Sequence, residues 1–208
     1  MAEKRCTLDP RIRRTRQLLQ QALEKLLETK GFDEISVLDI TGAATVNRAT
    51  FYDHYVDKYA LLECLVAGRF HELLAQREVQ FDGTCGSALR AIALAVCDYL
   101  VRLLGPDGSR QPEPHMESAI IGVVRRILLE GLERRPRESG IPPEIVAATA
   151  SWAIYGASKE WAQVRDRCPA DEIATTIMSL VSPILRLTAT ETHAPTEAPR
   201  PPAPERQD

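Results

Sequence analysis

Residues 48–55, RATFYDHY, combine side chains that can bind phosphates and form hydrogen bonds to the base edges of a nucleic acid. An arginine such as Arg48 is long enough to make two hydrogen bonds to the edge of a guanine. The hydroxyls of Thr50 and Tyr52 can bond to phosphate or to base edges, and Ala49 is small enough to touch a thymine methyl. The alternative for a lone arginine on a short helix is a solvated side chain, so the interpretation depends on the elements that hold this segment.

Capping signals predict two short helices here. Ser36 is followed three residues later by Asp39, a loose capping box that predicts a short helix starting near Val37. Asn47 can cap a second short helix over residues 48–55. The two helices are therefore expected to meet at a tight turn.

A longer helix precedes this pair. Residues 12–30 repeat apolar side chains at spacings of three, four and seven, and Gly31 is expected to end the helix in the C′ position. Phe51 and Tyr55 lie four residues apart and are expected to face inward. A long helix followed by two short ones predicts a helix-turn-helix, whose second short helix enters the major groove of DNA.

Helical periodicity continues through the rest of the chain. Asp57 can cap a fourth helix that begins at Lys58 and runs to about residue 80. Further helices are expected over residues 86–104, 114–134, 142–166 and 170–188. No segment has a convincing strand pattern, so the predicted fold class is all-α.

Composition excludes several other kinds of protein. The net charge of −3 over 208 residues argues against a uniformly basic coat, although residues 1–16 hold six Lys or Arg and two acids. No run of eighteen apolar residues and no apolar leader is present, so we expect no membrane partner and a cytoplasmic location. The five cysteines form no CxxC pair, and the four histidines are widely spread, so no metal site or cofactor is predicted.

Residues 12–62 resemble the TetR family of transcriptional regulators. The matching positions, in chain order, are Ala22, Leu26, Gly31, Phe32, Ser36, Ile40, Ala44, Val46, Thr50, Phe51, Tyr52, His54, Tyr55, Lys58 and Leu61. The chain departs from the family at Thr41 and Thr45, where Ala and Gly are usual, and at Asp53, an acid in the reading helix. Because Thr45 lacks the freedom of glycine at positive φ, the turn is expected to be shaped differently.

The resemblance implies a set of DNA contacts. Ser36, Thr50 and Lys58 would meet phosphates, and Arg48 with Ala49 would read bases. The full predicted DNA-binding set is Arg14, Ser36, Asn47, Arg48, Ala49, Thr50, Tyr52, His54 and Lys58. Together with Arg14, Arg11 and Arg13 are expected to reach a phosphate or the minor groove as a basic arm, unless they form a solubilising tail. The alternative for His54 is a helix cap or a packing contact.

The resemblance also implies that the C-terminal helices bind a small-molecule effector and form a homodimer. Polar or soft residues on apolar faces are the candidates for the effector pocket: Cys97, Tyr99, His115, Met116, Trp152 and Tyr155. Small and apolar residues at helical spacing are the candidates for the dimer seam: Ala150, Ala153, Ala157, Ile177, Leu180, Val181 and Ile184. For both sets the alternative is ordinary core packing, and Trp152 is also a seam candidate.

The sequence thus predicts a basic arm (1–11), a helix-turn-helix DNA-binding domain (12–60), a helical effector-binding and dimerisation domain (61–189) and a disordered Pro-rich tail (190–208). The expected function is a ligand-released repressor that binds palindromic double-stranded operator DNA as a dimer. Catalytic motifs such as GxSxG and HExxH are absent from the sequence, so an enzyme is not expected. Two alternatives remain: a helical partner-binding module without DNA binding, and a small helical enzyme.

Overall fold

The computed structural model describes residues 9–77, 86–105, 113–134 and 141–186. These ranges contain eight α-helices and one 3-10 turn, and no strand, as the all-α prediction requires. The elements are α1 (Pro10–Leu27), η1 (Phe32–Glu34), α2 (Val37–Ala44), α3 (Arg48–His54), α4 (Lys58–Ala75), α5 (Gly86–Leu104), α6 (Pro114–Glu133), α7 (Pro143–Gln163) and α8 (Ala170–Arg186).

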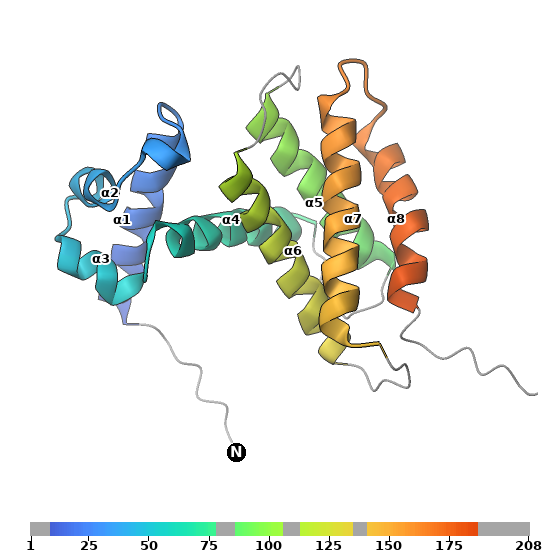
Figure 1. Cartoon of the computed structure of the whole chain (residues 1–208), viewed down its shortest axis with the longest axis horizontal. Helices are drawn as coiled ribbons and strands as arrows, with labels where there is room; N and C mark the ends of the chain where they lie inside the picture. Colours follow the sequence, from blue (N-terminus) through green and yellow to red (C-terminus); the bar gives the residue numbers. More distant parts are fainter. Residues whose placement is uncertain (1–8, 78–85, 106–112, 135–140, 187–208) are drawn as a thin grey trace, which may run out of the picture.

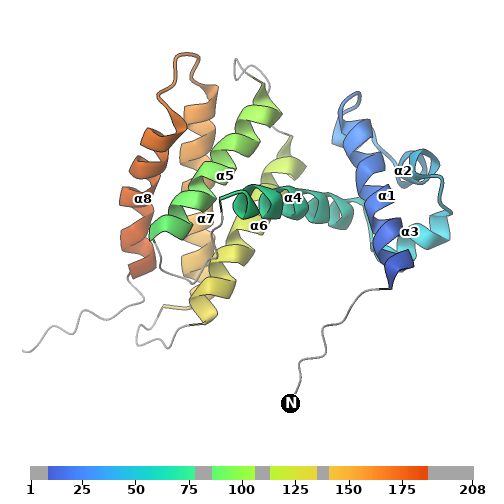
Figure 2. The same ribbon diagram turned by 180° about the vertical axis from the view of Figure 1, so that it is seen from behind.

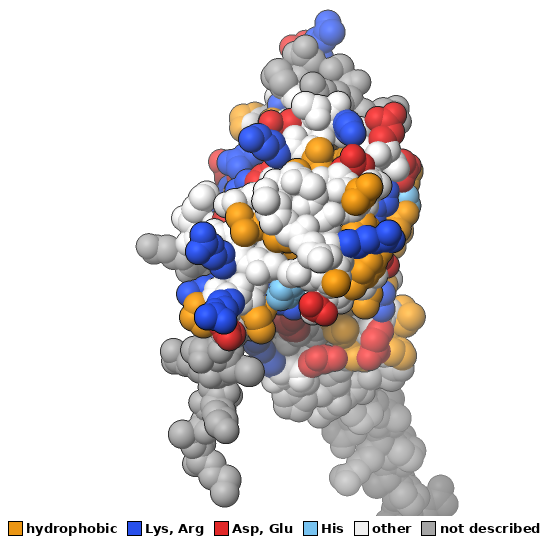
Figure 3. Space-filling model, turned by 90° about the vertical axis from the view of Figure 1, so that its left-hand side faces the viewer, with side chains coloured by type: hydrophobic (Ala, Val, Ile, Leu, Met, Phe, Trp, Pro, Cys, Tyr) orange, Lys and Arg blue, Asp and Glu red, His pale blue; other side chains and the backbone are white. Residues whose placement is uncertain are grey.

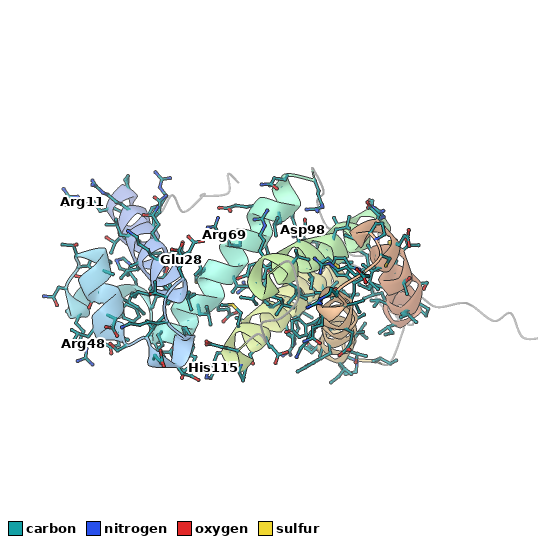
Figure 4. All side chains as sticks on the ribbon, turned by 90° about the horizontal axis from the view of Figure 1, so that it is seen from above. Arg11, Glu28, Arg48, Arg69, Asp98 and His115 are labelled. Atoms are coloured by element: carbon teal, nitrogen blue, oxygen red, sulfur yellow. The ribbon has the colours of Figure 1, made fainter. Side chains whose placement is uncertain are left out.

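The helices form two units joined by α4 (Figure 1). α1, α2 and α3 gather at one end, and α5 to α8 stand side by side at the other, with α4 running from the first unit into the second (Figure 2). α4 is continuous across residue 60, where the sequence suggested a boundary, so one rigid helix belongs to both units. Arg69 of α4, labelled in Figure 4, forms an ion pair with Glu24 of α1.

Aromatic and aliphatic side chains close the core of the N-terminal unit. Leu23 of α1, Phe32 of η1, Ile40 of α2 and Phe51 of α3 are all fully buried. Tyr55, directly after α3, is also buried and tilts against the ring of Phe51 at 5.9 Å between centroids. The expected inward orientation of Phe51 and Tyr55 is confirmed, and it fixes which face of α3 points outward.

Side-chain caps start all the helices of this unit. The Asp9 carboxylate accepts from the backbone at the start of α1, and Ser36 and Asp39 form the complete capping box at α2. Asn47 caps α3 and Asp57 caps α4. Each cap satisfies a backbone N–H group that would otherwise lack a partner. The four helices therefore begin directly after these residues.

Two turns differ from expectation. Gly31 does not end α1 as a C′ residue, because the helix ends at Leu27 and Gly31 is extended, with φ −64° and ψ 148°. The α2–α3 turn was expected to be shaped differently because it has threonine in place of glycine. Thr45 nevertheless adopts the left-handed conformation, with φ 55° and ψ 43°. Thr45 is the single non-glycine residue with positive φ among the described positions, so threonine adopts here the conformation that glycine would take at lower cost.

The helices of the body begin and end close to the predicted residues. α5 matches the expected range, and α6 and α8 begin at the predicted residues. α6 ends one residue before the predicted end, α7 is one residue shorter at its start and three at its end, and α8 is described as far as Arg186. Within the described ranges, none of the helices is long and apolar enough to cross a bilayer. The predicted Pro-rich tail, most of the predicted arm and the end of the fourth predicted helix lie outside the described residues.

Candidate nucleic-acid interface

The outward face of α3 presents the predicted reading residues to solvent. Asn47 Oδ1 accepts a hydrogen bond from the backbone N–H of Ala49 at 2.9 Å, and the buried Phe51 holds the helix from behind. Arg48, Ala49 and Tyr52 are exposed. The end of the molecule that carries α2 and α3 shows both basic and acidic side chains around a largely uncharged centre (Figure 3).

The Arg48 and Tyr52 side chains lie next to each other on this face. Arg48 Nη2 is 3.4 Å from the Tyr52 hydroxyl, and its guanidinium carbon is 5.7 Å from the centroid of the Tyr52 ring. A guanidinium resting on an aromatic ring is partly ordered before it meets a base or a phosphate. Figure 4 shows Arg48 pointing away from the body.

The other predicted contacts of the short helices are less free. The Ser36 hydroxyl donates to Asp39 Oδ2 at 2.6 Å and accepts from the Asp39 backbone N–H at 3.1 Å, so the capping box already uses it. Hydrogen bonds from Ser36 hold the pKa of the Asp39 carboxyl below its ordinary value. Thr50 and His54 are half-buried at the edge of the α3 face.

Lys58, predicted to contact a phosphate, has partners within its own unit. Its ammonium donates to the backbone carbonyls of Phe32, Asp33 and Ile35 at 2.9, 3.2 and 2.8 Å. These bonds use the three hydrogens of the ammonium, which also lies 4.6 Å from the centroid of the Phe32 ring. Lys58 therefore fastens η1 to the start of α4.

The arginines near the N-terminus are helical. Because α1 begins at Pro10, the exposed Arg11, Arg13 and Arg14 lie on its first turns and do not form an extended arm. Arg11 projects from the end of the molecule that also carries Arg48 (Figure 4). A helical position limits their reach to the length of the side chain, which favours a phosphate over the floor of the minor groove.

Sequence reasoning missed two exposed apolar side chains of this unit. Leu38, on α2, is 70% exposed, and Val56, after α3, is 81% exposed. Val56 lines a shallow hollow of about 360 Å³ together with Tyr52 and the acidic residues of η1. The available signal was the inward-facing stripe of α2, Ile40 with Ala44, which leaves Leu38 on the opposite side.

The predicted effector-pocket residues of the body do not gather in one place. Four of them are buried or nearly so and already have partners. The Cys97 thiol donates to the Ser158 hydroxyl at 3.6 Å, and the Tyr99 hydroxyl to Met116 Sδ at 3.7 Å. Burial raises the pKa of Cys97 to about 11 and that of Tyr99 to about 12.

Tyr155, the fourth buried candidate, belongs to a polar cluster. Its hydroxyl donates to Glu117 Oε1 at 2.8 Å, and the Lys159 ammonium donates to the same oxygen at 2.6 Å. Burial and the neighbouring Glu117 carboxylate raise the pKa of Tyr155. Burial opposes ionisation of Glu117, but the bonds from Lys159 and Tyr155 outweigh it and leave the pKa of Glu117 lowered.

The other two pocket candidates lie apart from these four. Trp152 is 63% exposed on the outer side of α7. His115 lies at the junction of the two units, with its Nε2 3.1 Å from Asp33 Oδ1 and its ring 4.8 Å from that of Tyr59. His115 also lines a hollow of about 390 Å³ between α4 and α6.

The predicted seam residues divide in the same way. Ala150, Ile177 and Val181 are buried within the body of their own chain, so the core alternative holds for these three. Leu180 is 61% exposed, and Ala153, Ala157 and Ile184 are partly exposed. Spacing alone could not separate the two faces, because both faces of α7 and α8 carry apolar residues.

A capped, outward-facing helix on a three-helix unit defines a helix-turn-helix DNA-binding domain. The sequence model of the bacterial regulatory proteins of the tetR family matches residues 19–65. Over these residues the helix-turn-helix of this chain resembles that family.

Two transcriptional regulators share sequence with this chain. The chain is 40% identical over 73 residues to the HTH-type transcriptional regulator YxbF of Bacillus subtilis, covering 35% of this chain and 19% of the relative. It is 30% identical over 154 residues to the HTH-type transcriptional regulator EthR of Mycolicibacterium smegmatis, covering 74% of this chain and 65% of the relative. The chain thus spans less than two thirds of the length of either relative.

The fold of the whole chain has solved counterparts. A TetR-family regulator of Streptomyces coelicolor matches with a TM-score of 0.58 and 18% identity, covering 86% of this chain and 98% of the other. FadR of Thermus thermophilus, a TetR-family repressor solved with lauroyl-CoA, matches with a TM-score of 0.51 and 19% identity, covering 90% and 100%. The likeness extends beyond the helix-turn-helix to the arrangement of the body helices.

Proposed function

We propose that this chain is a transcriptional regulator that binds a palindromic DNA operator as a homodimer and is released from it by a small molecule. The observation that carries the proposal is the exposed face of α3, where Arg48, Ala49 and Tyr52 are presented by a capped and anchored helix. Arg48 reads bases in the major groove, and the arginines of α1 contact phosphates. As a regulator of genes, the protein acts in the cytoplasm, and repression is the expected mode.

A dimer is needed because one short helix contacts only a few base pairs. The outer faces of α7 and α8 offer apolar side chains for it: Trp152 is 63%, Leu180 61% and Ile145 58% exposed. Monomeric proteins seldom leave several large apolar side chains in water on neighbouring elements. We therefore assign the seam to these side chains together with Ala153, Ala157 and Ile184.

The effector acts on α4, because that helix carries the N-terminal unit on the body. The hollow of about 390 Å³ between α4 and α6 has the volume of a small-molecule site, with Leu62 and Ala119 on its walls and His115 and Ser118 as polar groups. A ligand wedged there moves α4 and changes the distance between the two reading helices. Release requires that the ligand bind the DNA-free arrangement more tightly than the DNA-bound one.

The test is a titration of the protein onto its own upstream DNA and onto random DNA at several salt concentrations. Arg48→Ala is expected to weaken binding to the upstream DNA by about ten- to a hundredfold and binding to random DNA much less. Arg125→Ala, which removes an exposed arginine of α6, is the matched control and is expected to change neither. Absence of salt-dependent DNA binding by a folded dimer, over a wide operator library, would favour the partner-binding alternative.

A further inference from the structure

The first turn of α6 contacts the N-terminal unit directly. Glu113 precedes α6 as its N-cap but makes no capping bond there. Its Oε2 instead accepts a hydrogen bond from the backbone N–H of Phe32, in η1, at 2.8 Å. A residue of the body therefore holds the backbone of the DNA-binding domain 81 positions earlier in the chain.

Gly31 permits this contact by having no side chain. A Cβ atom added at Gly31 would lie 2.9 Å from Glu113 Oε1, closer than real Cβ contacts. The backbone of Gly31 is extended, with φ −64°, so it does not require glycine for conformational reasons. A side chain at this position would instead displace the Glu113 carboxylate.

Further contacts hold the same turn from two sides. His115 Nε2 lies 3.1 Å from Asp33 Oδ1, and the His115 ring packs 5.7 Å from the ring of Phe32, measured between centroids. On the other side, the Lys58 ammonium of α4 bonds to the carbonyls of η1. η1 is thus clamped between α4 and α6.

The first turn of α6 is itself fixed to α7. Glu117, four residues after Glu113, accepts the hydrogen bonds from Tyr155 and Lys159 of α7. α6 and α7 also pack side by side (Figure 1). A continuous set of polar contacts therefore runs from η1 through one helical turn to α7, a helix of the proposed seam.

We propose that Glu113 is a positioning residue for DNA binding: it sets the angle at which each protomer presents α3, and so the half-site spacing that the dimer prefers. Glu113 lies directly before α6 and does not belong to the reading face. The inference rests on the proposed function, because spacing has meaning only for a dimer on a two-part operator. The geometric reason is that a rotation of the domain about the start of α4 moves the two reading helices apart or together.

The experiment measures binding to a single half-site and to palindromes whose half-sites are separated by a series of spacings. For Glu113→Ala we expect half-site affinity within about twofold of the wild type and about a tenfold loss of discrimination between the best spacing and its neighbours, because a bond to a charged group is lost. Glu113→Gln keeps an acceptor for the Phe32 N–H and should retain most of the discrimination. Glu130→Ala, at an exposed position of the same helix, is the control.

Gly31→Ala supplies a second route to the same effect. Its new Cβ displaces the carboxylate, so it should flatten the spacing profile as Glu113→Ala does. Because both changes break one contact, the double variant should be no worse than either single one. Additive effects of the two changes, an unaltered spacing profile for Glu113→Ala, or a half-site loss equal to the palindrome loss would each overturn the proposal.

The Phe32 amide separates failure of this inference from failure of the proposed function. In the wild-type protein, NMR should show slow hydrogen exchange at this amide, and Glu113→Ala but not Glu130→Ala should accelerate it by about tenfold or more. If the wild type prefers no palindrome over random DNA, the proposed function fails and the role of Glu113 in operator spacing falls with it. Acceleration at Phe32 would then still establish the clamp, whereas equal exchange in all variants would overturn the clamp itself.

Discussion

The N-terminal unit and the helical body use the same kinds of side chain in opposite ways. In the N-terminal unit Arg48 and Tyr52 stand in solvent on a helix of seven residues, and Ser36 and Asn47 serve as caps. In the body Cys97 and Tyr155 are buried and already bonded to Ser158 and Glu117. Arg48 and Tyr52 of the first unit are therefore available to a partner, whereas Cys97 and Tyr155 stabilise the packing of the body's own helices.

The two units differ in how far apart in the chain the interacting residues lie. A cap and its helix lie within four residues of each other, so local sequence specifies both. A buried polar group in the body is defined by a partner that is distant in the chain: Cys97 bonds to a residue 61 positions away and Tyr155 to one 38 positions away. If the two units differ in this way, a change in one should leave the other intact.

The largest effect is expected from emptying the core of the N-terminal unit. Phe51→Ala removes a fully buried ring and should cost about 3–5 kcal/mol of stability, enough to unfold this unit and abolish DNA binding. The body should keep its helices and its oligomeric state. Circular dichroism melting with size-exclusion chromatography measures this, and the control is Tyr52→Ala at an exposed position. Simultaneous loss of the body would contradict the separation of the two units.

Burial of Cys97 gives the body a pH dependence. The pKa of this thiol is raised to about 11 from an ordinary 9.0, so the folded state holds the proton more tightly and is favoured below pH 9. About 3 kcal/mol should be lost between pH 9 and 11, at about 1.4 kcal/mol for each unit of pKa. Urea unfolding at several pH values, compared between wild type and Cys97→Ala, isolates this contribution. The same change in the free energy of unfolding between pH 9 and 11 in both proteins would refute it.

The same burial predicts a difference between thiols. In the native protein at pH 8, Cys97 should resist an aromatic disulfide reagent, whereas the exposed Cys64 and Cys168 should react. Mass spectrometry of the labelled peptides identifies the sites. Rapid labelling of Cys97 would mean that the body opens readily around it.

The exposed face of the body should carry the dimer. Trp152→Glu places a charge in the proposed seam and should weaken dimerisation by about 2 kcal/mol or more, as expected for a central aromatic side chain of an interface. Sedimentation at a range of concentrations measures the dissociation constant. Glu160→Gln, another exposed position of α7, is the control. If the dimer survives Trp152→Glu unchanged, the seam lies on another face.

The smallest effect concerns the turn between α2 and α3. The left-handed conformation of Thr45 is strained, so Thr45→Gly should relieve about 1 kcal/mol of strain. Part of this gain in stability is offset because glycine gives the unfolded chain more conformational freedom. We expect a net stabilisation of about 0.5 kcal/mol, with DNA binding retained. Thr45→Ala, which keeps a Cβ, should bring no such gain. Destabilisation by glycine would show that the threonine side chain has a role of its own.

Much of the fold could be predicted because helices are local structures. Periodicity located the long helices of the described ranges, Ser36 and Asn47 located the two short ones, and Asp57 marked the start of α4. Gly31 shows the limit of such reasoning, since its neighbour is the Glu113 carboxylate across the junction and it does not end α1.

The sequence by itself therefore determined the all-α class, the helix-turn-helix and the reading helix with Arg48 on it, because caps and apolar spacing act over one or two turns. Only the tertiary structure decided that Lys58 fastens η1, that Ile177 and Val181 belong to the core while Leu180 faces water, and that Glu113 reaches the DNA-binding domain. The physical reason is that burial and long-range hydrogen bonds depend on which helix faces are brought together. Several helices of this chain have apolar residues on more than one face, so spacing alone does not say which face is covered.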